Sequence, residues 1–285
     1  MRKLMAIFAH PDDEGAIGGT LAHYARDNTE VMLVCGTRGE VGEISDPALA
    51  TPENLGEVRQ RELETACEIL GIQFLEFLDY RDSGMDGTSQ NGDSRALVQA
   101  DPTQVIGQLV GLIRRFQPDA VVTFEPFGWY GHPDHIAISR WTTEAVALSG
   151  DEDAYPDSAP EWQPERFYHA VLPFSKFRSM IEAAVEAGLI EGSSIAENIP
   201  QEQQLHTEAM VTHVIDVTAT FDIKQRAMVS HKTQFSEDHM FKKVPREKMI
   251  EASGNEYFIQ VYPTPEEGST EKFLADLFAA GEVVA

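Results

Sequence analysis

Two short segments of this chain each carry a pair of metal-binding side chains three positions apart. The first, Ala-His-Pro-Asp-Asp-Glu, holds His10 and Asp13, and the second, Gly-His-Pro-Asp-His, holds His132 and His135. On one helical turn, side chains three positions apart lie on the same face. Two imidazoles and one carboxylate that converge and leave one position open form a catalytic metal site, which suits zinc in hydrolases and also ferrous iron.

The same residue types also occur in ordinary turns and helix caps, so each segment has a purely structural explanation as well. Each segment, however, follows an apolar run, residues 4–9 for the first and residues 120–124 for the second. If both runs are strands of one parallel sheet, right-handed crossovers place their carboxyl ends at the same edge, where ligands of such sheets bind. Two such segments at matching positions therefore favour a metal site over two unrelated turns.

Apolar runs alternate with segments of helical periodicity through the first half of the chain. The predicted strands cover residues 4–9, 30–35, 72–78 and 120–124, and the predicted helices cover residues 18–26, 57–70, 102–116 and 134–148. This alternation is typical of an α/β fold with a mostly parallel sheet and helices on both faces. The strands are continuously apolar, as expected for a sheet that is buried on both sides.

The second half of the chain is less regular. Further strands are predicted over residues 166–173 and 212–217, and further helices over residues 174–187 and 221–231. Residues 151–164 are acidic and proline-rich, which is typical of a linker or a surface excursion. Beyond Gln234 the pattern predicts no element.

The composition disfavours several classes of partner. The chain has 22 basic and 47 acidic residues in 285, a net charge of −25, so it repels nucleic-acid phosphates and anionic lipid surfaces. No run reaches the ~18 apolar residues that span a bilayer. Cys35 and Cys67 are the only cysteines, which indicates a reducing compartment and predicts a cytoplasmic protein. The sequence leaves open whether the chain forms a homo-oligomer.

The two His-Pro-Asp segments resemble those of the LmbE/PIG-L family of zinc-dependent N-deacetylases. Two further segments, Arg-Asp-Ser-Gly-Met at 81–85 and Tyr-Gly-His-Pro-Asp-His at 130–135, resemble the mycothiol-pathway branch, which contains an N-acetylglucosaminyl-inositol deacetylase and a conjugate amidase. The resemblance implies a Rossmann-like fold, a zinc cofactor and a small amino-sugar substrate. It also implies one domain over residues 1–285, with the motifs in 1–150 and with 151–285 completing the fold and the substrate pocket.

The resemblance assigns the residues of the first motif that spacing alone does not distinguish. It implies that His10, Asp13 and His135 bind the metal and that Asp12 is the general base that activates water. Zinc lowers the pKa of its bound water to about 7 and polarises an amide oxygen.

Three residues around the second motif receive further roles from the same resemblance. His132 is the expected general acid, which protonates the departing amine. Tyr130 is expected to help polarise the acetyl carbonyl. Asp134 is expected to orient the adjacent histidines.

The resemblance also implies three substrate contacts, each of which has a structural alternative. Arg59 contacts substrate, or it pairs with Glu57 or Glu62 on its own helix. Asp82 contacts the sugar, or it caps a loop. Met85 contacts the sugar, or it packs against its neighbours.

Three more residues are expected near the site. Glu14 and Glu40 are expected to hold its backbone rather than to react. His231 lies in Ser-His-Lys-Thr-Gln, which resembles a C-terminal motif of the family, and it also fits a helix-end histidine that complements the helix dipole.

The sequence as a whole favours a zinc-dependent hydrolase that removes acetyl from an N-acetylglucosaminide. An amidase that acts on a mycothiol-type conjugate is the alternative, but Ile17 stands where such amidases are expected to carry a lysine. A second alternative is a metal-binding or small-molecule-binding protein without turnover. Such a protein would need neither a general base nor a general acid, so the presence of both candidates disfavours it. The absent Gly-x-Gly-x-x-Gly fingerprint disfavours a dinucleotide-binding oxidoreductase.

Overall fold

A computed structural model describes most of the chain. The described residues are 1–173, 175, 176, 178, 179, 182, 185, 210–236, 240–264 and 276–278. The helix predicted over 174–187 lies largely outside them.

The fold is built on one seven-stranded sheet with the order β3-β2-β1-β4-β5-β7-β6. The strands are β1 (Arg2–Phe8), β2 (Thr29–Thr37), β3 (Phe74–Tyr80), β4 (Ala120–Phe124), β5 (Arg166–Val171), β6 (His213–Asp216) and β7 (Asn255–Tyr262). All pairings among β1 to β5 are parallel, whereas β7 pairs antiparallel with both β5 and β6. The predicted mostly parallel sheet is therefore confirmed.

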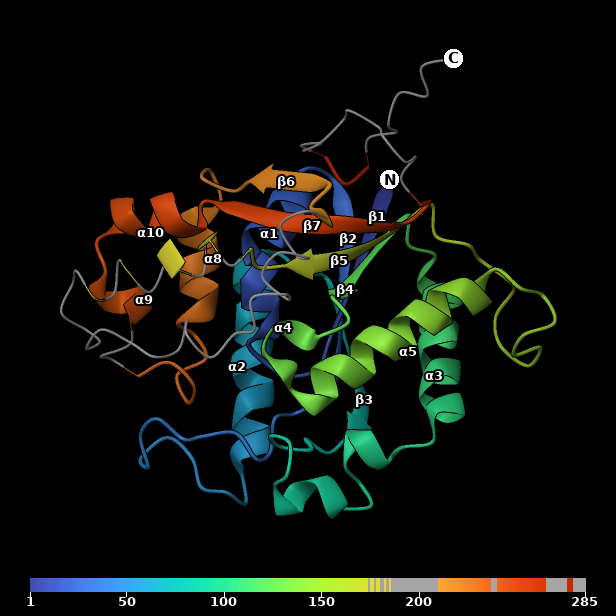
Figure 1. Cartoon of the computed structure of the whole chain (residues 1–285), viewed down its shortest axis with the longest axis horizontal. Helices are drawn as coiled ribbons and strands as arrows, with labels where there is room; N and C mark the ends of the chain where they lie inside the picture. Colours follow the sequence, from blue (N-terminus) through green and yellow to red (C-terminus); the bar gives the residue numbers. More distant parts are fainter. Residues whose placement is uncertain are drawn as a thin grey trace.

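Helices cover both faces of this sheet, as predicted (Figure 1). The helix α3 (Pro102–Phe116) packs against α5 (Pro133–Ser149) on one face. On the other face, α1 (Gly18–Arg26), α2 (Leu55–Leu70) and α8 (Phe221–Met228) pack against one another. The other helical elements assigned within the described residues are η1 (Asp13–Ile17), η2 (Ser89–Gly92), η3 (Leu97–Gln99), α4 (Gly128–Gly131), α9 (Met240–Lys243) and α10 (Arg246–Ser253).

Local sequence signals explain where the regular elements begin and end. Asp101 caps α3 because its side chain accepts a hydrogen bond from Thr103 N at 2.9 Å, and Pro102 fits the first helical position. The strand β4 is five apolar or small residues, all buried. Both elements have the predicted bounds.

The order of the strands places a crevice beside β1. Its neighbours are β2 on one side and β4 on the other, so the chain progresses in opposite directions from this strand. The carboxyl ends of strands at such a reversal are where open α/β sheets bind ligands. The loops that follow β1 and β4 carry the two histidine motifs, which therefore meet at this crevice.

The structure decides between the two alternatives for residues 151–164 and adds elements beyond Gln234. Residues 151–164 form a surface excursion rather than a linker, because Arg114 of α3 donates to the carbonyl oxygens of Asp151, Ala154 and Tyr155 at 2.6–3.1 Å. Beyond Gln234, where no element was predicted, α10 and β7 are well formed. The strand β7 is stabilised by two antiparallel partners from distant parts of the chain, which local periodicity cannot reveal.

Within the described ranges, no helix combines the length and the apolar character needed to cross a membrane.

Candidate metal centre

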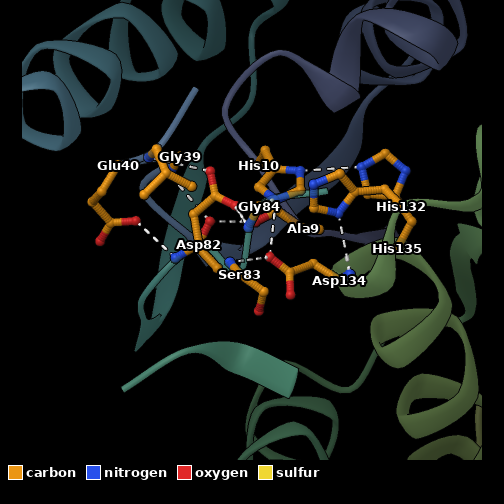
Figure 2. Close-up of polar contacts among 12 residues, drawn as sticks. Ala9, His10, Gly39, Glu40, Asp82, Ser83, Gly84, His132, Asp134 and His135 are labelled. Carbon is orange, nitrogen blue, oxygen red and sulfur yellow. Dashed lines mark hydrogen bonds and ion pairs between the residues drawn. The ribbon is translucent and has the colours of Figure 1, made fainter. Parts of the chain in front are cut away.

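Histidine rings from the two motifs meet at the carboxyl ends of β1 and β4 (Figure 2). His10 Nδ1 lies 3.1 Å from His135 Nε2, and both residues are buried. Among the described residues, two overlapping groups have donor atoms within 4.8 Å of one another: His10, His132 and His135, and His10, Asp82, His132 and Asp134. The crevice therefore holds a buried cluster that could bind a metal ion.

The Asp13 carboxylate lies beside His10 and His135. Its Oδ2 accepts hydrogen bonds from the N–H groups of Ala9 and His10, at 3.2 and 2.7 Å, which fixes the side chain. Its Oδ1 lies 3.3 Å from His135 Nε2, and its Oδ2 lies 3.6 Å from His10 Nδ1. The structure thus brings together His10, Asp13 and His135.

His10 and His135 each have one ring nitrogen that faces away from the other ring, and the contact at that outer nitrogen defines where the ring's lone pair points. His10 Nε2 lies 3.1 Å from a carboxylate oxygen of Asp134, and His135 Nδ1 lies 3.3 Å from the carbonyl oxygen of Gly128. If these outer nitrogens carry the protons, the inner nitrogens present two lone pairs to each other at 3.1 Å. Donor atoms on a tetrahedral zinc ion lie about 3.3 Å apart, given zinc–nitrogen bonds of about 2.0–2.1 Å. The donor set therefore fits a divalent metal ion.

Charges around His10 also favour a cation in this crevice. Burial alone would lower the pKa of His10, but the carboxylates of Asp13, Asp134 and Asp82 outweigh it and raise the pKa well above its usual value. Burial opposes ionisation of Asp13 as well, yet His135 and His10 hold its pKa well below the usual range. A field that favours an imidazolium among carboxylates also favours a metal cation there.

His135 is held in place by the strand and loop before it. Its ring stacks on Phe124 of β4 with centroids 4.1 Å apart and planes 10° apart. Gly128 has φ of +68°, and a Cβ at this position would lie 2.6 Å from His135 Cβ, so only glycine lets the loop approach this closely. The chain between β4 and α5 is thereby shaped around the histidine.

The Asp134 carboxylate faces the histidine of the other motif rather than those beside it in sequence. Its Oδ2 accepts from His10 Nε2 at 3.1 Å and from Ser83 N at 2.9 Å (Figure 2), and its Oδ1 has no hydrogen-bond partner among the described residues. The side chain is fully buried. A carboxylate at the outer nitrogen of a metal-binding histidine fixes the ring and strengthens its basicity. In this structure Asp134 contacts the outer nitrogen of His10, as a carboxylate that orients the ring would.

His132 is the N-cap of α5. This is the helix-cap role that was the structural alternative for its motif. Its Nδ1 accepts a hydrogen bond from Asp134 N at 3.2 Å, so a neutral ring carries its proton on Nε2. Burial, together with His10 and His135, lowers the pKa of His132 to about 4. His132 is thus held as a neutral imidazole whose remaining N–H is free of the cap.

Asp12 occupies an unusual backbone conformation beside the cluster. Its φ is 110°, which non-glycine residues rarely adopt and which costs about 1–3 kcal/mol. Its N–H donates to Glu14 Oε2 at 3.0 Å, and its Oδ1 lies 3.3 Å from an Arg59 nitrogen. Burial raises the pKa of Asp12 to about 6 despite Arg59, with Asp13 and Glu14 adding to the rise.

Arg59 is buried and pairs with neither Glu57 nor Glu62. Its guanidinium donates to the carbonyl oxygens of Gly39 and Pro11 and lies beside Asp12. Glu62 instead accepts hydrogen bonds from the N–H and hydroxyl of Thr233, at 2.9 and 2.6 Å. Arg59 therefore supports the loops around the site, and the same contacts bring it next to Asp12.

The other predicted substrate contacts differ in exposure. Asp82 is buried, accepts from Gly84 N at 2.8 Å, and lies 3.5 Å from His10 Nε2, so it caps its loop and also faces the cluster. Burial alone would raise the pKa of Asp82, but His10 holds it well below the usual range. Met85 is exposed. Tyr130, which was expected to polarise the acetyl carbonyl, is exposed as well, and its ring centroid lies 5.0 Å from that of His135.

Two glutamates hold the backbone of the site, as predicted. Glu14 accepts from Asp12 N, and Glu40 accepts from Asp82 N at 3.0 Å. The partner of Glu14 is His231, whose Nε2 lies 2.6 Å from its other oxygen, with both side chains fully buried. Burial alone would lower the pKa of His231, but Glu14 outweighs it and raises the pKa. No spacing signal links residues this far apart, so this pair could not be predicted from the sequence.

The chain is similar to proteins of one known family. Residues 5–146 match the PIG-L family model, described as GlcNAc-PI de-N-acetylase. A 1D-myo-inositol 2-acetamido-2-deoxy-alpha-D-glucopyranoside deacetylase of Catenulispora acidiphila is 34% identical over 288 residues, which is 98% of this chain and 89% of the relative.

Solved structures show the same fold at lower identity. The N,N'-diacetylchitobiose deacetylase of Pyrococcus horikoshii superposes with a TM-score of 0.64 at 21% identity, over 93% of this chain and 87% of the other. The 4-carboxy-2-hydroxymuconate hydratase of Pseudomonas putida superposes with a TM-score of 0.62 at 20% identity, over 94% and 99%. Since a hydratase shares it, the fold alone does not define the reaction. The sequence match over nearly the whole length does define the family, and this chain belongs to the PIG-L family of GlcNAc-PI de-N-acetylases.

Proposed function

We propose that this chain is a zinc-dependent deacetylase that removes the acetyl group from an N-acetylglucosaminide, with an inositol glycoside as its substrate. The carrying observation is the buried cluster in which His10 Nδ1, His135 Nε2 and the Asp13 carboxylate lie 3.1–3.6 Å from one another. Membership of the family and the named activity of the Catenulispora relative support the same reaction.

The proposed ligands are His10, Asp13 and His135. His132 is close enough to compete with Asp13, but its Nδ1 is already engaged as the cap of α5. Asp13 brings a negative charge and is held by two backbone N–H groups, which favours it as the third ligand. A bound zinc ion supplies a Lewis acid that polarises the amide carbonyl and lowers the pKa of water. Ferrous iron suits the same donors and is the alternative metal.

Asp12 is the proposed general base. Its carboxylate is adjacent to the metal ligand Asp13, and its pKa of about 6 is suited to accepting a proton near neutral pH. Arg59 lies 3.3 Å from Asp12 Oδ1 and directs that side chain. The base therefore takes a proton from a water molecule as this water attacks the acetyl carbon.

His132 and Tyr130 are the proposed proton donors. A phenol has a usual pKa of about 10 and stays protonated near neutral pH, so the Tyr130 hydroxyl can donate to the carbonyl oxygen. His132 can give a hydrogen bond from Nε2 as a neutral ring. To protonate the leaving amine it must first become an imidazolium, in which Nδ1 also carries a proton and the bond from Asp134 N is lost. The acid role thus requires the cap of α5 to open during the reaction.

The proposed sugar contacts are Arg59, Asp82 and Met85. Asp82 faces His10 from the loop after β3, and Met85 is exposed a few residues further along the same loop. The Arg59 guanidinium lies beside Asp12, so Arg59 would contact the part of the sugar that is bound next to Asp12.

We further propose that the chain acts as one cytoplasmic domain. The free cysteines Cys35 and Cys67 are both buried, which suits a reducing compartment. The C-terminal α8 contacts α1, α2 and η1, which suits a C-terminal part that completes the fold around the site.

The first test measures acetate release and metal content on the same sample. We expect the wild-type chain to release acetate from N-acetylglucosaminyl-inositol with about one zinc per chain. The variant His135→Ala should lose both, because a metal ligand is removed. Near-full zinc occupancy in that variant would exclude His135 from the site.

The second test separates the deacetylase from a conjugate amidase. Ile17 does not separate them by contact, because its side chain is only 2% exposed and belongs to the hydrophobic core. The substrates should therefore compete directly: N-acetylglucosaminyl-inositol, a simple N-acetylglucosaminide and a mycothiol-type conjugate. Ratios of kcat/KM measure differential binding of the transition states. If the conjugate has the highest kcat/KM, the proposed substrate is wrong, whereas the proposal of a metal-dependent hydrolase still holds.

A further inference from the structure

A histidine from the far end of the chain reaches the turn that carries Asp12. His231 follows α8, and its ring is fully buried against Glu14 of η1. The distance between His231 Nε2 and Glu14 Oε1 is 2.6 Å. Neither residue belongs to the proposed metal ligands or proton donors, so this contact has another purpose.

Glu14 connects this histidine to the backbone of Asp12. Its second oxygen, Oε2, accepts the N–H of Asp12 at 3.0 Å. This N–H belongs to the residue whose φ is 110°, a conformation that persists only where the surroundings hold it. A carboxylate fully removed from water needs a donor to remain in place, and His231 is the donor on its other side.

The packing of α8 shows that this contact is built into the fold. Met228 lies so close to Gly15 that a Cβ on that glycine would be 2.9 Å from Met228 Cγ. Lys224, one helical turn earlier, donates to the carbonyl oxygen of Ala16 at 3.2 Å. Three consecutive positions of η1 are therefore fitted to α8 and to the histidine that follows it.

We propose that His231 is a positioning residue that, through Glu14, holds Asp12 in its left-handed conformation and so aims the carboxylate at the reacting water. The inference rests on the proposed function, in which Asp12 is the general base. Among the described residues, no hydrogen bond or ion pair joins His231 to the proposed metal ligands or sugar contacts, and its contact with Glu14 links it to the backbone of Asp12. Its loss therefore reduces turnover and leaves metal binding and substrate affinity in place.

The test compares two replacements of His231 with a matched control. His231→Leu fills the space and cannot donate, whereas His231→Gln places an amide N–H near the position of Nε2. The control is His213→Leu, which removes another buried histidine, from β6 at the edge of the sheet. Zinc content, melting temperature, kcat and KM are measured for all three. If His231→Leu does not fold, His231→Asn replaces it, because its shorter amide does not reach Glu14.

Since a general base contributes about 10²–10⁴-fold, we expect kcat of His231→Leu to fall about 10- to 100-fold. Zinc content should be unchanged and KM should change less than about threefold, as for loss of an interaction made only in the transition state. His231→Gln should recover most of kcat. The control should keep the wild-type kcat even if its melting temperature falls by the same amount. A wild-type kcat in His231→Leu, a loss confined to KM, or an equal loss in the control would overturn the proposal.

A crystal structure of His231→Leu tests the positioning without reference to activity. We expect Asp12 to leave the left-handed region and its carboxylate to turn away from the histidine cluster. An unmoved Asp12 would overturn the positioning role. If the wild-type chain releases no acetate, the proposed function fails, and this structure still decides whether His231 positions Asp12.

Discussion

The contact between Asp134 and His10 predicts a defined loss of metal affinity. Asp134 Oδ2 accepts from His10 Nε2 at 3.1 Å and from Ser83 N at 2.9 Å, in a fully buried position. Asp134→Ala removes the acceptor of both hydrogen bonds, so the His10 ring loses the contact that fixes its tautomer and orientation. Asp134→Asn keeps one neutral acceptor and loses the charge.

The size of the effect follows from the kind of interaction. A hydrogen bond to a charged group contributes about 1.5–3 kcal/mol, and loss of a partner behind a metal ligand lowers affinity by about 10- to 100-fold. Because a tenfold change corresponds to about 1.4 kcal/mol, these two ranges agree. We expect about 100-fold weaker zinc binding for Asp134→Ala and about tenfold for Asp134→Asn. The alanine variant should also unfold more easily by about 1–3 kcal/mol, because Ser83 N loses its acceptor.

The assay is competition for zinc with a chromogenic chelator at one pH near neutrality. The matched control is Asp82→Asn, because Asp82 Oδ1 lies 3.5 Å from the same His10 nitrogen and is the weaker contact. We expect the zinc affinity of this control to fall less than about threefold, which is well below the typical loss when a hydrogen-bonded partner of a metal ligand is removed. Wild-type affinity in Asp134→Ala, or a larger loss in Asp82→Asn than in Asp134→Asn, would refute the role of Asp134 in orienting His10.

Three further predictions concern proton transfer and pH. Asp12→Ala should keep its zinc and lose about 10²–10⁴-fold in kcat, since a base is lost without a ligand; steady-state rates on metal-loaded protein measure this, and an undiminished kcat would exclude Asp12 as the base. His132→Ala should lose a similar factor, and His132→Gln decides how the ring acts: recovery of rate by glutamine, which donates a hydrogen bond but no proton, would refute the general-acid role. Burial lowers the pKa of both His169 and His213 to about 4, so below pH 6.5 the unfolded chain binds protons that the folded chain does not. Their contribution to stability is complete above the unfolded pKa and is lost as the pH falls towards 4, by about 2 kcal/mol for each between pH 7 and pH 5. Denaturant unfolding at the two pH values should show this loss, and replacing both histidines with glutamine should reduce it; an equal loss in the double variant would show that other groups cause it.

Local features of the sequence determined the elements of the first half and the two histidine motifs. The helix α3 and the strand β4 have their predicted bounds because a cap, a proline and an apolar run act within a few residues. The motifs were visible for the same reason, since each follows a strand closely in sequence. The strand β7 was not predicted, because its neighbours β5 and β6 are distant in the chain and provide its hydrogen bonds.

The tertiary structure alone decided which polar groups meet inside the protein. Arg59 has Glu57 and Glu62 within three positions on its own helix, yet its guanidinium binds the carbonyl oxygens of Pro11 and Gly39. Asp134 lies between two histidines in sequence, yet its carboxylate contacts His10 of the other motif. A buried polar group pairs with whichever groups lose water beside it, because an unpaired donor or acceptor costs more than most single contacts contribute. Those neighbours are set by how distant segments pack on the sheet, which no short stretch of sequence contains.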